Sequence, residues 1–285
     1  MFMRSSASPV RSKKIFALCV ALVGVVASAI SIPASADTLS DIMAKGKIEV
    51  ATEMQFPPFD MKDNGNYVGF DRDLIDAVAK EMGVKPDYID LPWSSVLPGL
   101  DAKKFDYVIS PVTITKERLT RFAFTVPISD STTTLVKRRG DNSITKPTDI
   151  FGKTVGALKA DASVVQLNDF AAKNGGKVSI REYADTIQST NDLAAGRLDG
   201  VIGSYPVMAY LVSKRSDDLA LVQPPFGVPQ YLSWVGRKDA ADASLTAKIN
   251  EILVKLQQNG TLATIQKKWL GAVTKLPTTV PVPAN

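Results

Sequence analysis

Two residue types that carry much of enzyme chemistry are almost absent from this chain. Its 285 residues contain no histidine and a single cysteine, Cys19. The lack of histidine excludes Ser-His-Asp and Cys-His triads, histidine-bound zinc and histidine proton shuttles. If Cys19 is removed with a leader, disulfides and thiolate chemistry are excluded as well. These absences argue against a hydrolase, and we expect a protein that is not an enzyme and has no cofactor or metal.

The first 36 residues have the pattern of a secretory signal peptide. Basic residues precede the apolar run IFALCVALVGVVASAISI at 15–32, and Ala34 and Ala36 then supply the small residues of a cleavage site. We therefore expect cleavage after Ala36 and a periplasmic protein. The run is also long enough for an uncleaved membrane anchor, which stays the alternative. A lipid anchor is disfavoured because Leu18, the residue before Cys19, is too large for a lipoprotein signal.

The positive net charge belongs mostly to this leader. The chain has 34 Lys and Arg against 29 Asp and Glu, and four of the basic residues but no acidic one lie in residues 1–36. The rest of the chain therefore carries 30 basic against 29 acidic residues. This balance gives no reason to expect a nucleic-acid partner.

After the leader, short apolar runs alternate with helical patterns, which favours α/β layers with largely parallel sheets. The first half has strand patterns at 47–51, 87–91 and 105–110, and helical patterns at 71–83, capped by Asp71, and at 94–104. The alternation then restarts, with strands within 148–158 and at 177–183 and 198–204, and helices at 161–176 and 186–197.

Two extended stretches, 125–139 and 223–237, connect the halves, and 243–271 reads as two helices separated at Asn259-Gly260. Two α/β lobes joined by two hinge strands predict a clamshell with a ligand between the lobes. We expect lobe 1 at 37–130, lobe 2 at 131–225, a return to lobe 1 at 226–273, and a flexible tail at 274–285.

One strand end carries a concentration of polar residues, VISPVTITKER at 108–118. If Thr115 caps a helix, Arg118 lies in its first turn, where a cation opposes the helix dipole. An anion nearby would explain this placement, because a guanidinium binds a carboxylate through two hydrogen bonds. The alternative is a solvated surface arginine.

Seven motifs occur in an order that resembles the periplasmic amino-acid-binding proteins of ABC importers, extracellular solute-binding protein family 3. They are QFPPFDM, GFDRDLIDAVAKEMGV, PWSSVLPGLDAKKFDYVIS, TITKERLTRFAFT, GKTVGAL, LAAGRLDGVIG and LQQNGTLATIQKKWLG. The resemblance implies a type II periplasmic-binding-protein fold. It also implies a small carboxylate-bearing ligand such as an amino acid, a membrane permease as partner, and a monomer.

The resemblance also implies roles for particular residues. An aromatic side chain in the first motif stacks on the ligand, here Phe56, and Trp93 closes over it. Arg118 pairs with the ligand carboxylate, beside the strand-end residues Ser110, Val112 and Thr113. Aromatic residues near proline are more often core than ligand contacts, so packing is the alternative for Phe56 and Trp93.

The departures from the family pattern concern both ends of the ligand. Pro111 has no N–H to offer the carboxylate. Ser204 stands where relatives have an aspartate that binds the ligand ammonium, and a hydroxyl cannot neutralise a desolvated ammonium. We therefore expect a carboxylate-bearing ligand whose amine is held differently from that of an ordinary α-amino acid.

The loop KADAS at 159–163 contains a carboxylate, Asp161, that the family pattern lacks at this place. We expect this loop to bring Asp161, Ala162 and Ser163 to the ligand. Asp161 is also a good N-cap for the following helix, and Glu53, just past a strand end, is an ordinary surface carboxylate in its simplest reading. One hypothesis is that the ammonium site has moved to Asp161 or Glu53. The other is that the amine is displaced or absent, as in an ω-amino acid or an organic acid.

A second function remains open on the same fold. Some exported proteins of this architecture are similar to cyclohexadienyl dehydratases, which act on prephenate or arogenate with an acidic residue in the cleft. The leading hypothesis is nevertheless a binding protein, because closure over a solute needs no covalent chemistry.

Overall fold

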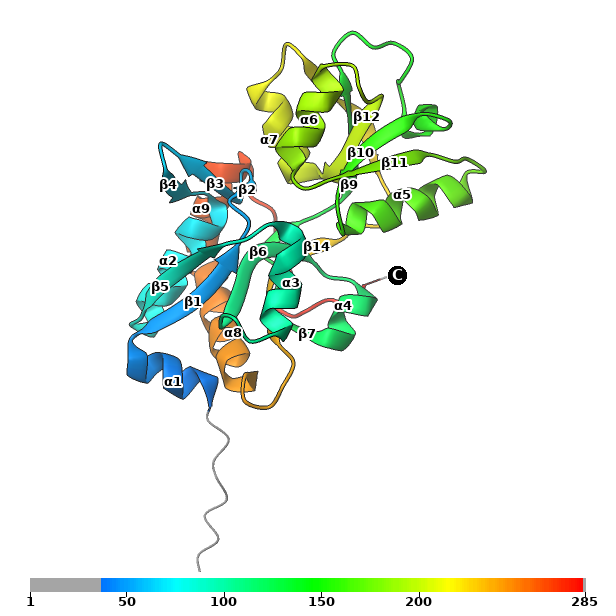
Figure 1. The fold of residues 1–285 in the computed structure, drawn as a ribbon. Helices are drawn as coiled ribbons and strands as arrows, with labels where there is room; N and C mark the ends of the chain where they lie inside the picture. The colour runs from blue at the N-terminus through cyan, green and yellow to red at the C-terminus, as the bar shows by residue number, and fades with distance from the viewer. Residues whose placement is uncertain (1–36, 284–285) are drawn as a thin grey trace, which may run out of the picture. The chain divides into compact units, whose positions relative to one another are not determined.

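The computed structural model describes residues 37–283, so the predicted signal peptide lies outside the described residues. Two mixed sheets with their helices form two lobes, in agreement with the predicted α/β clamshell (Figure 1). Within 37–283, no helix has the length and apolar character needed to cross a bilayer.

The first sheet has the strand order β5–β1–β6–β14–β7, and β8 also pairs with β14. Strands β1, β5 and β6 are parallel, whereas β14 is antiparallel to β6. The parallel strands therefore place their carboxyl ends, Thr52, Asp90 and Thr113, on one edge of the sheet. The strands are β1 (Lys47–Thr52), β5 (Lys85–Asp90), β6 (Tyr107–Thr113), β7 (Phe122–Phe124), β8 (Ser129–Asp130) and β14 (Tyr231–Arg237).

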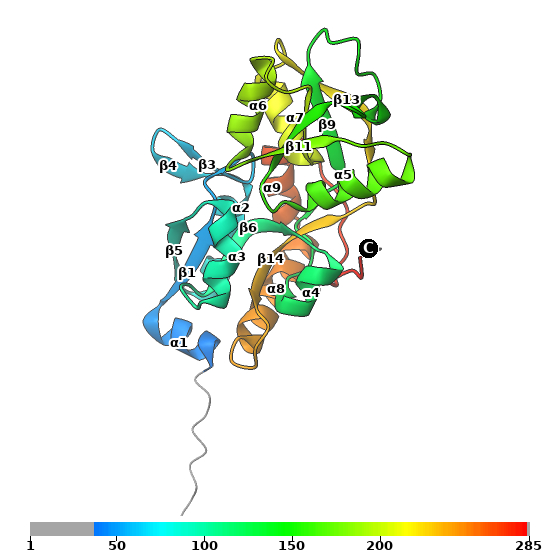
Figure 2. The ribbon, with the colours of Figure 1, turned by 45° about the vertical axis from the view of Figure 1, so that its right-hand side comes forward.

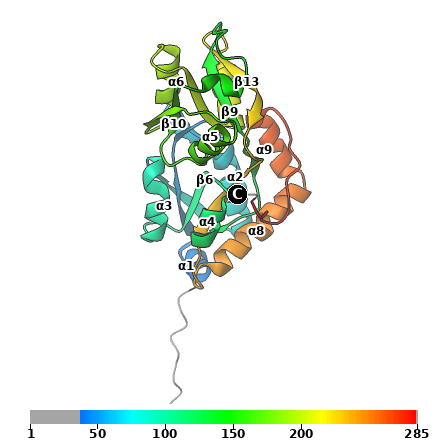
Figure 3. The same ribbon diagram turned by 90° about the vertical axis from the view of Figure 1, so that its right-hand side faces the viewer.

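Helices cover both faces of this sheet. Figure 3 shows α3 on one side and α8 and α9 on the other. The sequence predicted most of these helices, including the break between α8 and α9, because their apolar spacing is regular. The helices are α1 (Thr38–Lys45), α2 (Phe70–Met82), α3 (Trp93–Asp101), α4 (Lys116–Arg121), α8 (Ala243–Gln258) and α9 (Thr261–Leu270).

The predicted cap of α2 is wrong. The N-cap is Gly69, and Asp71 lies inside the first turn, fully buried, where its Oδ1 accepts a hydrogen bond from Trp234 Nε1 at 2.6 Å. Gly69 has φ +142°, and a Cβ there would lie 2.0 Å from the Phe59 carbonyl oxygen. Only glycine fits this approach, so the helix starts without a side-chain cap.

A short hairpin sheet follows β1 and contains the first predicted aromatic ligand residue. Its strands are β2 (Gln55–Phe56), β3 (Asp60–Asp63) and β4 (Asn66–Val68), in the order β2–β3–β4. The sequence pattern indicated only a turn here, because strands of two to four residues are too short to show alternation.

The second lobe is built on the sheet β11–β10–β12–β9–β13. Strand β10 is parallel to β11 and β12, and β9 is antiparallel to its neighbours β12 and β13. The strands are β9 (Thr133–Arg138), β10 (Thr154–Leu158), β11 (Ser179–Tyr183), β12 (Gly200–Ser204) and β13 (Leu219–Phe226). The helices are η1 (Pro147–Ile150), α5 (Ala162–Lys173), α6 (Thr186–Ala194) and α7 (Tyr205–Lys214), of which the sequence missed α7.

The chain passes between the two sheets twice. It leaves the first sheet after Asp130 in β8 and enters the second at Thr133 in β9, then leaves β13 at Phe226 and re-enters the first sheet at Tyr231. Beyond α9, residues 272–283 have no helix or strand, although Leu276 and Val280 pack against the core. The lobe boundaries and the flexibility of the tail stay predictions.

Candidate functional site

Arg118 lies where the sequence predicts, in the first turn of α4 beyond the carboxyl end of β6. Thr115 is the N-cap, and its Oγ1 accepts a hydrogen bond from the Arg118 N–H at 3.2 Å. The guanidinium Nη1 donates to the Thr113 carbonyl oxygen at 3.1 Å, and the guanidinium carbon lies 5.6 Å from the centre of the Trp93 ring. A guanidinium has five N–H donors, so donors remain for a carboxylate.

The carbonyl oxygen of Ala160, in the second lobe, meets the first lobe at this point. It accepts hydrogen bonds from Arg118 Nη2 at 3.1 Å and from Trp93 Nε1 at 3.4 Å. Ala160 has φ +61°, a left-handed conformation that costs a non-glycine residue about 1–2 kcal/mol. Strained backbone of this kind concentrates at ligand-binding sites, which is consistent with the place of Ala160.

Arg118 keeps its charge in this setting. Burial lowers the pKa of its guanidinium, whereas the negative charges of Asp161 and Glu117 raise it. Because an unperturbed guanidinium has a pKa above 12, the group stays protonated at neutral pH. It is therefore a permanent cation held by carbonyl groups of both lobes.

A cavity of about 590 Å³ opens beside Arg118, and we call it the arginine cavity. It lies between α3 and α4 of the first lobe and α5 of the second, which face each other in Figures 2 and 3. Four predicted site residues line it, namely Trp93, Arg118, Asp161 and Ala162. The sequence did not single out Gln166, Glu182 or Gln230, which line it as well.

A second cavity of about 260 Å³ also takes its walls from both lobes, and we call it the acidic cavity. Its residues are Glu53, Gln55, Asp90, Leu91 and Pro92 of the first lobe and Ala184, Asp185 and Gln188 of the second. Glu53 is only 3% exposed, so its reading as a surface carboxylate is wrong. Glu53 directly follows the carboxyl end of β1, and this end of the strand lies at the cleft between the lobes. Its side chain is therefore buried in the cleft and does not lie on the outer surface.

The surroundings of Glu53 favour its protonated form. Burial first, and then repulsion from the carboxylates of Asp60, Asp185, Asp161 and Asp90, raise its pKa to about 8. Desolvation and like charge both disfavour an ionised carboxylate, and they act together here. A positive group entering the acidic cavity would favour the ionised carboxylate and so lower the pKa of Glu53.

The sequence left two roles open for Asp161, the N-cap of α5 and the partner of the ligand ammonium, and the structure is compatible with both. Its Oδ1 accepts a hydrogen bond from the Ser163 N–H at 2.8 Å, so it caps α5 as predicted. Its charge also acts on Arg118 and on Glu53, so it lies within electrostatic reach of both cavities. A carboxylate in this position can meet the ammonium of a solute bound to Arg118.

The other predicted residues line neither cavity. The Phe56 ring packs on Phe59, with centroids 6.1 Å apart and planes 24° apart, which favours its core reading. The β6 residues Ser110, Val112 and Thr113 are buried, and of these Thr113 reaches the site through its carbonyl oxygen. The Ser163 and Ser204 hydroxyls are buried without a hydrogen-bond partner in the described residues. Ligand contacts by these six residues stay predictions.

The sequence missed Asp90 and Asp185 as site residues. Asp90 ends β5, and Asp185 caps α6 by accepting a hydrogen bond from the Gln188 N–H at 2.7 Å. Both positions are at carboxyl ends of parallel strands or the loops that follow them, where ligands of α/β folds bind. That rule could have found them.

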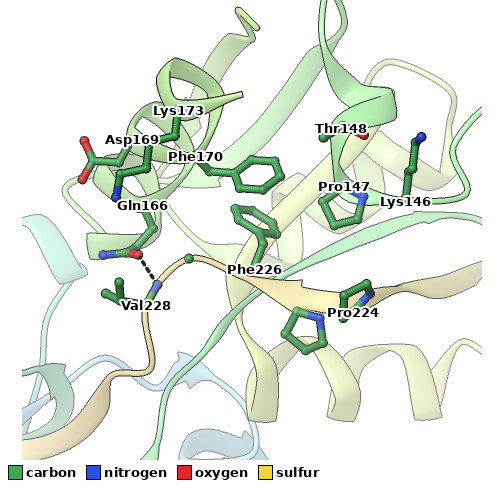
Figure 4. A pocket seen from close by; sticks show the side chains of 12 residues that line it. Lys146, Pro147, Thr148, Gln166, Asp169, Phe170, Lys173, Pro224, Phe226 and Val228 are labelled. Atoms are coloured by element: carbon green, nitrogen blue, oxygen red, sulfur yellow. Dashed lines mark hydrogen bonds between the residues drawn. The ribbon is translucent and has the colours of Figure 1, made fainter. Parts of the chain in front are cut away.

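A further cavity of about 480 Å³ lies on the second lobe and contains none of the predicted residues. Figure 4 shows Phe170 and Phe226 facing each other in it, with Gln166 at its edge. Gln166 lines the arginine cavity too, and its Oε1 accepts a hydrogen bond from the Val228 N–H at 3.0 Å. Because Val228 lies in the return crossing between the sheets, Gln166 connects α5 to that crossing.

Two α/β lobes joined by two crossings, with an arginine and several carboxylates around interlobe cavities, define a two-lobed solute-binding protein. The family model of bacterial extracellular solute-binding proteins, family 3, matches residues 48–272. The chain belongs to this family, which confirms the resemblance seen in its motifs.

Among curated proteins, the chain is 31% identical to the L-cystine-binding protein TcyJ of Escherichia coli (strain K12) over 264 residues, or 90% of this chain and 97% of that protein. It is 32% identical to the lysine/arginine/ornithine-binding periplasmic protein of the same strain over 231 residues, or 78% and 86% of the two chains. Both relatives are binding proteins, in agreement with the expectation that this chain is not an enzyme.

Solved structures show the same fold. An ancestral arginine-binding protein bound to arginine has a TM-score of 0.72 and 32% identity, over 79% of this chain and 98% of its own. The ancestral amino acid-binding protein AncCDT-1, a precursor of cyclohexadienyl dehydratase, has a TM-score of 0.74 and 30% identity, over 82% and 99%.

Proposed function

We propose that the chain is the periplasmic receptor of an ABC importer, which binds an amino acid between its lobes as a monomer and delivers it to a membrane permease. The single observation that carries this proposal is Arg118, a permanent cation beside an interlobe cavity, hydrogen-bonded to carbonyl groups of both lobes. A ligand carboxylate on Arg118 would contact both lobes at once and so stabilise the closed form.

The carboxylates around the cleft favour a solute with positive charge. Asp161 is suited to the α-ammonium, the role that Ser204 cannot fill, and the acidic cavity is suited to a second cation on the side chain. A basic amino acid has a group for each of the three positions: its carboxylate for Arg118, its α-ammonium for Asp161 and its side-chain cation for the acidic cavity. The names of relatives that bind lysine, arginine or ornithine support this ligand class.

Closure is proposed to be a hinge motion at the two crossings, residues 130–133 and 226–231. Gln166 would couple the arginine cavity to the second crossing, because its Oε1 accepts a hydrogen bond from the Val228 N–H. The hydrogen bonds that Trp93 and Arg118 donate to the Ala160 carbonyl oxygen join the two lobes.

A thermal-shift screen tests the receptor function. Arginine, lysine, ornithine, citrulline, glutamine, cystine, ω-amino acids and organic acids are added to the purified protein. A ligand present at a hundred times its Kd adds about 2.7 kcal/mol of stability, a shift of roughly 5–10 °C for a chain of this size. We expect the largest shifts with basic amino acids.

Two results would contradict this function. One is the absence of a shift with every compound of the screen. The other is the appearance of phenylpyruvate on incubation with prephenate, which would favour the dehydratase-like enzyme over the receptor.

Exchange of Asp161 for asparagine tests the ammonium position. Asparagine is an equally good N-cap, so the Asp161→Asn variant keeps the acceptor for the Ser163 N–H and loses only the charge. We expect the Kd for arginine to rise about tenfold to a hundredfold, the effect of losing a charged hydrogen bond of about 1.5–3 kcal/mol.

Calorimetric titration gives this Kd, and Asp149→Asn is the matched control because Asp149 caps a surface turn in the second lobe. An unchanged Kd in the Asp161→Asn variant would refute the new ammonium position. The hypothesis of a displaced or absent amine would then be the better one.

A further inference from the structure

The acidic cavity holds three carboxyl groups, and their partners differ. Asp90 is paired with Lys62 Nζ at 2.6 Å and accepts a hydrogen bond from the Met54 N–H at 3.0 Å. Asp185 accepts from the Gln188 N–H as the cap of α6. Each of these two carboxylates therefore has a hydrogen-bond donor from the protein.

Glu53 has no such support. It lines the acidic cavity, is 97% buried, and receives no hydrogen bond from another group within residues 37–283. A buried ionised carboxylate without a partner is costly, whereas its protonated form loses little on burial. The protein thus buries a carboxyl group at the wall of a ligand cavity and leaves it without a counter-ion.

The charges that raise the pKa of Glu53 most come from carboxyl groups on four elements. They are Asp60 of β3, Asp90 at the end of β5, Asp161 at the start of α5 and Asp185 at the start of α6. The cations of this region are engaged elsewhere, Lys62 with Asp90 and Arg118 with the carbonyl oxygens of Thr113 and Ala160. Repulsion and burial thus keep a proton on Glu53 in the empty receptor, and raise its pKa to about 8.

We propose that Glu53 exchanges its proton for the solute: a cationic group entering the acidic cavity displaces the proton to solvent and pairs with the carboxylate left behind. The protonated receptor and the cationic solute give the complex and one free proton, so charge and protons balance. This inference rests on the proposed receptor function and adds to it a regulation by pH.

Proton release makes affinity depend on pH in a ligand-specific way. Where one proton is released, the Kd for a cationic solute falls about tenfold for each unit of rising pH, and the dependence ends once Glu53 is ionised in the empty receptor. A neutral solute of the same shape leaves the proton in place. The receptor would thus favour cationic over neutral amino acids more strongly at pH 7.5 than at pH 6.

Arginine and citrulline are the probes that test this exchange, because they have nearly the same shape and differ in side-chain charge. Each is titrated calorimetrically at pH 7 in phosphate, HEPES and Tris, whose ionisation enthalpies differ, so the dependence of the heat on buffer counts the protons exchanged. We expect close to one proton released with arginine and none with citrulline. We also expect the Kd for arginine to fall about tenfold from pH 6 to pH 7.

The Glu53→Gln variant resembles the neutral form of Glu53 and should fold normally. We expect it to bind arginine more weakly, without proton release and without the pH dependence. Glu49→Gln is the matched control, since Glu49 lies on β1, the strand that Glu53 directly follows, but pairs with Lys47 at the surface. This control should release the proton as the unaltered protein does.

The outcomes separate the inference from the function on which it rests. Arginine binding without proton release, or proton release that persists in Glu53→Gln, would overturn the exchange and leave the receptor function intact. So would a receptor that binds neutral amino acids and neither arginine nor lysine. If no compound of the thermal-shift screen binds, the receptor function fails and the exchange fails with it.

Discussion

Replacement of Arg118 by glutamine is expected to raise the Kd for the bound amino acid from about a hundredfold to a few thousandfold. The guanidinium lines the arginine cavity and donates to carbonyl groups of both lobes. Its removal leaves a desolvated ligand carboxylate without its partner, which costs about 3–5 kcal/mol. At 1.4 kcal/mol for each tenfold change, this gives the expected range.

Calorimetry or a thermal shift with arginine measures the effect of Arg118→Gln. Arg197→Gln is the matched control, because Arg197 is an exposed arginine bonded to Asp192 on the surface of the second lobe. The Kd of Arg118→Lys should lie between those of Arg118→Gln and the control, since lysine keeps the positive charge but cannot bind a carboxylate in a bidentate way. A Kd within threefold of the unaltered protein in Arg118→Gln would show that the carboxylate binds elsewhere.

Asp71→Ala is expected to destabilise the protein by about 2–4 kcal/mol, whereas Asp71→Asn should be close to neutral at pH 7. Asp71 and Asp60 are both fully buried; Trp234 Nε1 donates to one oxygen of Asp71, and the Tyr67 hydroxyl donates to one oxygen of Asp60. Alanine removes the acceptor of the buried Trp234 N–H, which costs about 1–3 kcal/mol, and leaves a small cavity that adds to this cost. Asparagine keeps an acceptor for Trp234 and has nearly the same volume.

The same pair gives stability a particular dependence on pH. Burial raises the pKa of Asp71 well above 3.8, and the charge of Asp60 adds to the effect. A carboxyl with a raised pKa in the folded state binds more protons than in the unfolded state. The free energy of unfolding is therefore highest below pH 4 as far as Asp71 is concerned. It falls as the pH rises toward the pKa of Asp71 in the folded state, by up to about 1.4 kcal/mol per pH unit for each proton.

Urea unfolding at pH 5 and pH 8 measures this slope. We expect the unaltered protein to lose stability between the two values and Asp71→Asn to lose less, with Asp63→Asn as an exposed control on the neighbouring strand β3. Equal slopes in the unaltered protein and in Asp71→Asn would show that Asp71 does not hold the extra proton.

The fold followed from the sequence where patterns are long and local. The apolar spacing of Leu74, Ile75, Val78 and Met82 predicted α2, and all four side chains are buried. The short hairpin β2–β4 and the helix α7 were missed, because two to four residues show no period and the apolar residues of Tyr205–Lys214 have a weak one. Asp71 was misread as a cap because its role depends on Trp234, which is 163 positions away.

The sequence by itself determined the class of the protein and the residues whose roles arise from close neighbours. Thr115 capping the helix of Arg118, and Asp161 capping α5, depend on groups two or three positions away, so they could be read from spacing. Only the tertiary structure decided the charge of the site. Glu53 and the carboxylates of Asp60, Asp90, Asp161 and Asp185 are brought together from separate elements, and it is their burial and mutual repulsion that set where the proton resides.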